Sequence, residues 1–167
     1  MGEKTRDNLY TAFVGEAKAY HRLQAFARQA DEEGLTQIAK LFRAIAAAEG
    51  VHVERHLRLL GEAVVKDTET NLQSSFERET TVNEVYYPQF IREASEEGEK
   101  AAVLTFSQAR DVEEGHAKLY KHALRALLRD ETHDYYVCSV CGHVAEREPP
   151  DQCPICQAGR EKFRLIT

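Results

Sequence analysis

The chain has 167 residues, enough for one domain with a proper core plus a small appendage. Its net charge is −6, and an acidic surface repels phosphate backbones, which argues against a nucleic-acid partner. Its apolar runs fall short of the roughly 18 residues of a membrane span, and its first ten residues lack the apolar core of a signal peptide. We therefore expect a cytoplasmic protein with no membrane partner.

Four helices are predicted over residues 5–130, which are rich in Ala, Leu, Glu, Lys and Arg and contain few helix breakers. The expected helices are 5–32, 35–60, 74–96 and 99–129. Pro88 should kink the third helix because it removes a backbone hydrogen bond. The turns at Gly34 and Gly98 are short and predict antiparallel neighbours. The connection of residues 62–74 looks long enough to cross the bundle, which is the connectivity of ferritin-like folds.

An internal repeat supports this pairing of helices. Residues 26–52 align without a gap on residues 90–116, and nine of the 27 positions are identical. Convergent helix composition would readily supply the Ala and Glu matches, but not the shared Phe, Gly and His. We therefore expect two helical hairpins related by a pseudo-twofold axis.

Each helix of the predicted bundle carries a glutamate on its apolar stripe, and two helices add a histidine three residues later. The six residues are Glu16, Glu49, His52, Glu79, Glu113 and His116. Residues three apart on a helix share one face, so each Glu-x-x-His pair can point at one spot. Burying four unpaired carboxylates would cost several kcal/mol each. Two divalent cations would resolve that conflict.

This ligand pattern is typical of ferritin-like di-iron or di-manganese sites. Four carboxylates balance two Fe²⁺, and equally two Fe³⁺ joined by an oxo bridge. Carboxylate and imidazole ligands with open positions suit iron or manganese in oxygen chemistry better than structural zinc. The remaining histidines have no comparable setting and are predicted to lie on the surface. They are His21, His56, His122, His133 and His143.

All four cysteines lie in the last thirty residues, in two Cys-x-x-Cys pairs separated by eleven residues. They are Cys138, Cys141, Cys153 and Cys156. Four thiolates on two tight turns predict a closed tetrahedral site, which holds iron or zinc equally well by geometry. Zinc would make this module structural, whereas iron would make it a one-electron carrier. We therefore predict a helical bundle over residues 1–132 and a small domain with a four-cysteine metal site over residues 133–167.

The chain as a whole resembles the rubrerythrin family. The resemblance rests on Gly15-Glu16, the two Glu-x-x-His pairs, Glu79 with Tyr87-Pro88 downstream, and the segment CSVCGHVAEREPPDQCPIC followed by Phe163. It implies a mainly α, ferritin-like di-iron bundle and a rubredoxin-type iron on the four cysteines. It also implies reduction of hydrogen peroxide to water in oxidative-stress defence, a reductase or rubredoxin as electron donor, and a homodimer in which the cysteine-bound iron of one subunit lies near the di-iron site of the other.

One position departs from the family pattern. The family carries Glu-x-x-Glu in the third helix, and counting back from Tyr87 puts those positions at Glu79 and Val82. In the family, the second glutamate exchanges with the histidine of helix two as the iron changes oxidation state. Because valine cannot bind metal, we predict that His52 stays on iron in both states. Tyr87 either donates a hydrogen bond near the metal or packs at the Tyr-Pro kink.

The leading hypothesis from the sequence is a non-haem di-iron peroxidase. One rival is a ferroxidase or an oxygen-reducing iron-handling protein, whose tail is a redox partner or a zinc ribbon. A rival from another class is a non-enzymatic protein in which the cysteine module is an interaction domain.

Overall fold

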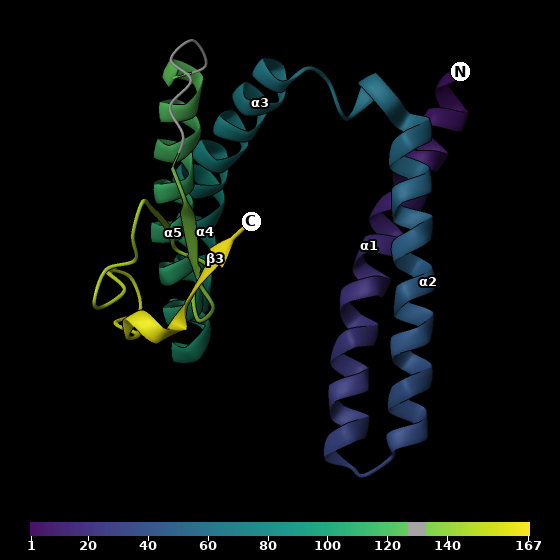
Figure 1. Cartoon of the computed structure of the whole chain (residues 1–167), viewed down its shortest axis with the longest axis horizontal. Helices are drawn as coiled ribbons and strands as arrows, with labels where there is room; N and C mark the ends of the chain where they lie inside the picture. The colour runs from purple at the N-terminus through teal and green to yellow at the C-terminus, as the bar shows by residue number, and fades with distance from the viewer. Residues whose placement is uncertain (127–132) are drawn as a thin grey trace. The chain divides into compact units, whose positions relative to one another are not determined.

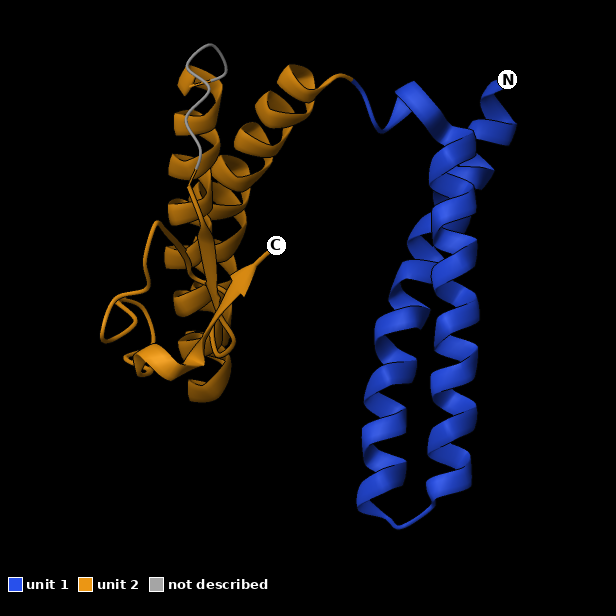
Figure 2. Cartoon of the chain, viewed as in Figure 1, with its two compact units in different colours: residues 1–66 blue, residues 67–167 orange. Residues whose placement is uncertain are grey.

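The computed structural model describes residues 1–126 and 133–167 (Figure 1). It divides into two compact units, residues 1–66 and 67–167 (Figure 2). The described residues are mainly helical, with a few short strands near the C-terminus. Within the described part of the chain, no helix combines the length and apolarity needed to cross a membrane.

The first unit is a hairpin of two long helices, α1 (Glu3–Glu32) and α2 (Thr36–Leu60), which lie side by side in Figure 1. Its buried side chains are mostly alanines, among them Ala27, Ala39 and Ala46. Small side chains let two helix backbones approach closely. The predicted helices 5–32 and 35–60 are confirmed to within two residues at each end.

The turns that close the two hairpins have the same hydrogen bonds, as the internal repeat predicts. Gly34 and Gly98 both adopt positive φ, 75° and 77°, a conformation that glycine reaches without the steric cost of a side chain. The amide of Leu35 donates to the carbonyl of Ala30 at 2.8 Å, and the residues 64 positions later do the same at 2.9 Å. Both helices thus end in the six-to-one hydrogen bond of a Schellman motif.

The connection between the hairpins is shorter than the sequence led us to expect. Helix α3 (Thr68–Thr81) begins six residues before the predicted start at 74, so only residues 61–67 link it to α2. The early start follows from Asp67, whose carboxylate accepts hydrogen bonds from the amide (2.9 Å) and hydroxyl (2.7 Å) of Thr70. Such an N-cap satisfies a free amide of the first helical turn. Three of the seven linking residues form the 3₁₀ turn η1 (Gly61–Ala63).

The third predicted helix changes its winding just before Pro88, where the sequence predicts a kink. After α3 come a π-helical segment, η2 (Val82–Tyr86), and a further α-helix, α4 (Tyr87–Glu96), with Pro88 in its first turn. A proline has no amide to continue the ladder of hydrogen bonds, so the winding changes just before it. Wide turns of this kind are frequent at functional sites.

The second hairpin is completed by α5 (Lys100–Ala126), which packs against α3 and α4. Its predicted end near 129, like the predicted domain boundary after 132, lies outside the described residues. The C-terminal module then forms a three-stranded antiparallel sheet in the order β2-β1-β3. Its elements are β1 (Tyr135–Cys138), β2 (Val144–Glu146), the 3₁₀ turn η3 (Arg160–Lys162) and β3 (Phe163–Ile166).

Candidate metal centres

Three of the six predicted bundle ligands meet in the first unit. Glu16 on α1 and Glu49 and His52 on α2 each place a ligand atom within 4.8 Å of the other two. The Nδ1 atom of His52 lies 2.9 Å from the carboxylate of Glu49 and 3.9 Å from that of Glu16. The His52 side chain is 49% exposed. We call these three residues the first triad.

The other three predicted ligands meet in the second unit. Glu79 on α3 and Glu113 and His116 on α5 again place their ligand atoms within 4.8 Å of one another. His116 Nδ1 lies 2.9 Å from the Glu113 carboxylate, the same distance as in the first triad. Burial raises the pKa of Glu79, and the hydrogen bond and negative charge of Glu113 raise it further. We call these three residues the second triad.

The donor atoms of both triads fit iron. Each triad offers two carboxylates and one imidazole, which is a set that suits iron or manganese. The raised pKa of Glu79 reflects the burial and crowding of two carboxyl groups, and a bound cation would relieve that repulsion. The two triads contain four carboxylates and two imidazoles, the same types and numbers of donors as a ferritin-like di-iron centre.

Tyr87 lies beside the second triad. Burial raises the pKa of its phenol, and the negative charges of Glu113 and Glu79 raise it further. Its ring also packs against Phe90 and Phe106, with centroids 6.0 and 6.2 Å away. The geometry is compatible with both roles that the sequence left open for this residue.

The residues after Glu79 offer little to a metal. Val82 begins the π-helical segment and has no ligand atom. The side-chain amide of Asn83 donates to the backbone carbonyl of Arg110 on α5 at 2.7 Å, so it is already engaged in holding the two helices together. Glu84 is exposed.

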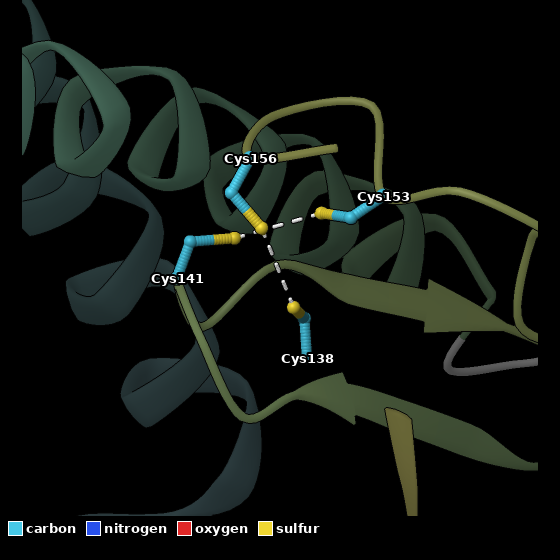
Figure 3. Close-up of side chains that lie close together, drawn as sticks. All are labelled: Cys138, Cys141, Cys153 and Cys156. Carbon is cyan, nitrogen blue, oxygen red and sulfur yellow. Dashed lines mark hydrogen bonds between the residues drawn. The ribbon is translucent and has the colours of Figure 1, made fainter. Parts of the chain in front are cut away.

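The four cysteines converge as predicted (Figure 3). The Sγ atoms of Cys138 and Cys156 are 3.7 Å apart, and those of Cys141 and Cys153 are 3.6 Å apart. A tetrahedral metal with bonds of about 2.3 Å to sulfur separates its sulfur ligands by about 3.8 Å. These two Sγ–Sγ distances therefore fit a single tetrahedrally coordinated metal ion.

The two cysteine turns have the same backbone hydrogen bond and the same positive-φ position. The amide of Gly142 donates to the carbonyl of Cys138 at 2.9 Å, and the amide of Gln157 donates to that of Cys153 at 2.9 Å. Gly142 and Gln157 both have positive φ, 85° and 62°. Burial raises the pKa of the Cys138 thiol, but hydrogen bonds from backbone amides outweigh it and the net pKa is lowered. Burial instead raises the pKa of the Cys141 and Cys156 thiols, and a bound metal cation would favour the thiolate forms that bind it.

One of these turns contacts the second triad directly. The Nε2 atom of His116 lies 3.2 Å from the carbonyl oxygen of Gly142. Because a carbonyl only accepts, this hydrogen bond requires a proton on Nε2, while Nδ1 faces the Glu113 carboxylate at 2.9 Å. Gly142 follows Cys141 in the chain, so one hydrogen bond separates the cysteine site from a predicted bundle ligand. Sequence spacing gave no sign of this contact, since the two residues are 26 positions apart.

The sequence also did not predict two further contacts in the second unit, both made by histidines. The prediction that His133 lies on the surface is wrong: its side chain is 12% exposed, and its Nε2 lies 3.1 Å from the carboxylate of Glu146. His122 on α5 lies 3.4 Å from the same carboxylate, so Glu146 ties β2 to the helix. His143 and His56 are half-buried rather than exposed.

Comparison with known proteins supports two kinds of metal site, one in the helical bundle and one on the four cysteines. The family model of rubrerythrin matches residues 7–124, and the model of the rubrerythrin rubredoxin-like domain matches residues 136–164. The chain belongs to the rubrerythrin family. Membership makes it an iron-binding protein of an oxidoreductase family, with a ferritin-like di-iron bundle and a four-cysteine rubredoxin-like site.

Relatives within the rubrerythrin family match along almost the whole chain. Nigerythrin of Nitratidesulfovibrio vulgaris is 34% identical over 95% of this chain and 85% of its own. Rubrerythrin-2 of Clostridium acetobutylicum is 31% identical over 97% of this chain and 96% of its own. Solved structures of nigerythrin in mixed-valent and fully reduced states match with a TM-score of 0.57, covering 99% of this chain and 88% of theirs.

Proposed function

We propose that this rubrerythrin-family chain reduces hydrogen peroxide to water in the cytoplasm, with electrons that a reductase or a rubredoxin delivers through the four-cysteine site. The observation that supports this best is the hydrogen bond between Gly142 and His116. It joins the one-electron site to the peroxide site by a path with a single non-covalent step.

The reaction needs two electrons and two protons for each peroxide, which becomes two waters. Iron held by the triads would supply the two electrons, and iron held by the cysteines would carry their replacements one at a time. The residues that would hold the bundle iron are Glu16, Glu49, His52, Glu79, Glu113 and His116. Their four carboxylates would balance the charge of two Fe²⁺ ions.

The residues around the second triad orient it. The Gly142 carbonyl holds the proton of His116 on Nε2, which fixes the tautomer that presents Nδ1 to the metal. A hydrogen-bond partner behind a ligating histidine fixes the orientation of the ring and raises its basicity. We assign to the hydroxyl of Tyr87, whose pKa is raised by burial and by the charges of Glu113 and Glu79, the role of donating a hydrogen bond to an oxygen atom of the substrate.

An anaerobic titration tests the proposal. Ferric iron on four thiolates is red and loses its colour on reduction, so reduced protein should regain the colour as stoichiometric peroxide is added. The variant Glu113→Ala should keep the red chromophore but lose rapid reoxidation by peroxide. The neighbouring variant Glu114→Ala is a matched control, because Glu114 is exposed and pairs with Lys118, and it should behave like the wild type.

A second candidate function is that of a ferroxidase or oxygen-reducing iron-handling protein. Two residues favour this candidate: Val82 has no ligand atom, and the side-chain amide of Asn83 already donates to the backbone of α5. Neither adds a fifth carboxylate, so the ligand set is the four-carboxylate set of ferritin-like oxidases. The same anaerobic titration distinguishes the two candidate functions. Reduced protein that is reoxidised by oxygen and ignores peroxide would replace the peroxidase with this candidate.

A further inference from the structure

The cysteine module contacts α5 at two separate points, and both belong to the segment from Gly142 to Glu146. At the first point the Gly142 carbonyl accepts from Nε2 of His116 at 3.2 Å, and a β-carbon on Gly142 would lie 3.9 Å from Cγ1 of Val112. At the second point Nδ1 of His122 lies 3.4 Å from the carboxylate of Glu146. His116 and His122 are six residues apart, which is about 9 Å along a helix.

A second histidine strengthens the contact at Glu146. Nε2 of His133 lies 3.1 Å from the same carboxylate oxygen, and the hydroxyl of Tyr135 lies 3.2 Å from that nitrogen. Nδ1 of His133 is buried and has no hydrogen-bond partner among the described residues, so the ring is held through Nε2. Because an ionised carboxylate only accepts, each imidazole must turn an N–H toward it. Glu146 thus collects hydrogen bonds from two rings on different parts of the chain.

The contact between Gly142 and His116 needs such a second attachment. A single hydrogen bond fixes the separation of two atoms, but it leaves the groups that carry them free to turn about it. A second attachment about 9 Å further along the same helix removes that freedom. Hydrogen bonds to a charged group are also stronger than the neutral bond at Gly142, so the Glu146 contact is the stronger of the two anchors.

The geometry points to Glu146 as a positioning residue for electron transfer. By holding the module on His122 and His133, it keeps the Gly142 carbonyl on Nε2 of His116. This inference rests on the proposed function in treating that hydrogen bond as the path of the electron. The step moves one electron from ferrous iron on the cysteines to ferric iron in the bundle, and it makes and breaks no bond. Glu146 is not one of the predicted ligands, so it acts only through the position of Gly142.

Nuclear magnetic resonance of the zinc-loaded protein tests the docking without a redox reaction. In the wild type, the Nε2 proton of His116 should give a resonance protected from solvent exchange, assigned by its absence in His116→Gln. In Glu146→Ala this resonance should broaden or disappear. The reason is that losing a hydrogen bond to a charged group shifts the balance between docked and undocked module about tenfold. The amide resonances of β1 and β3 should remain, because zinc still holds the cysteine turns.

Three further variants separate docking from a general loss of stability. Glu148→Ala is the matched control, because Glu148 belongs to the same module but is 82% exposed and lies 3.9 Å from Arg160. It should leave the His116 resonance unchanged. Glu146→Gln keeps an acceptor oxygen and should retain more of the resonance than Glu146→Ala. His122→Ala changes only an exposed position of α5, so it tests the same contact if Glu146→Ala does not fold, and it should weaken the resonance. A resonance unaffected by Glu146→Ala or by His122→Ala, or equally weakened by Glu148→Ala, would overturn the inference.

The iron-loaded protein supplies a second readout. Reduced Glu146→Ala should regain the full red colour with peroxide, but up to about tenfold more slowly than the wild type, whereas Glu148→Ala should match the wild type. An unchanged rate in a variant that has lost the His116 resonance would overturn the role in electron transfer. If the wild type ignores peroxide, the proposed function fails, and the His116 resonance still decides whether Glu146 positions the module.

Discussion

At the scale of single residues, the two equivalent histidines differ in how firmly they are held. His116 is bound on both nitrogens, by Glu113 and by the Gly142 carbonyl, and its side chain is 25% exposed. The contacts found for His52 are to the glutamates of its own triad, and its side chain is 49% exposed. Any ligand movement between oxidation states should therefore involve His52.

Val82 should suppress that movement. We predict that crystal structures of the oxidised and reduced wild type both show His52 on the metal, because no carboxylate at position 82 competes with it. In Val82→Glu the new carboxylate should displace His52 in the oxidised form, since a negative ligand binds the more highly charged ion more strongly. Val82→Gln, similar in size but neutral, is the control and should keep His52 in place. Loss of His52 from the metal in the oxidised wild type would disprove the prediction.

The two Glu-x-x-His pairs could be predicted from the sequence because their spacing is local. Glu-x-x-His on a helix places two ligands on one face whatever the rest of the chain does. The contact of Gly142 with His116 could not be predicted, since it depends on how the cysteine module packs on α5. The same holds for the contacts of Glu146 with His133 and His122, which lie far from it in the sequence.

At the scale of elements, the two Schellman turns should be equally important for stability. Replacing Gly34 by alanine should lower the free energy of unfolding by about 1 kcal/mol, because alanine at positive φ brings its side chain close to the backbone. Gly34→Asn should cost less than half as much, since asparagine tolerates this conformation. Urea unfolding at fixed protein concentration measures both. Equal losses for the two variants would show that the turn conformation is not the cause.

The helix boundaries show where reasoning from sequence fails. The signal for the early start of α3 was present: Asp67 is a favoured N-cap residue and Glu69 lies in the first turn. The absence of clear apolar periodicity over residues 68–73 concealed it. The π-helical segment had no signal beyond Pro88, because it depends on how Asn83 meets α5.

At the scale of the whole molecule, the homodimer that the family resemblance implies would couple unfolding to dissociation. Unfolding of such a dimer releases two chains, so its stability rises with protein concentration by mass action. A hundredfold increase in concentration should raise the Tm by about 4 °C. Calorimetry of the wild type across that range of concentration measures the shift. A Tm that does not change with concentration would contradict the homodimer.

The hydrogen bond from His116 to Gly142 also implies that the two metal affinities are linked. Without an ion, four crowded thiols no longer hold their turns in place, and the Gly142 carbonyl is then free to drift from the imidazole that it orients. Loading the cysteines should therefore strengthen metal binding at the second triad. Thermodynamic reciprocity requires the second triad to strengthen binding at the cysteines by the same factor. The chain would then fill its iron sites cooperatively, and half-loaded molecules would be rare.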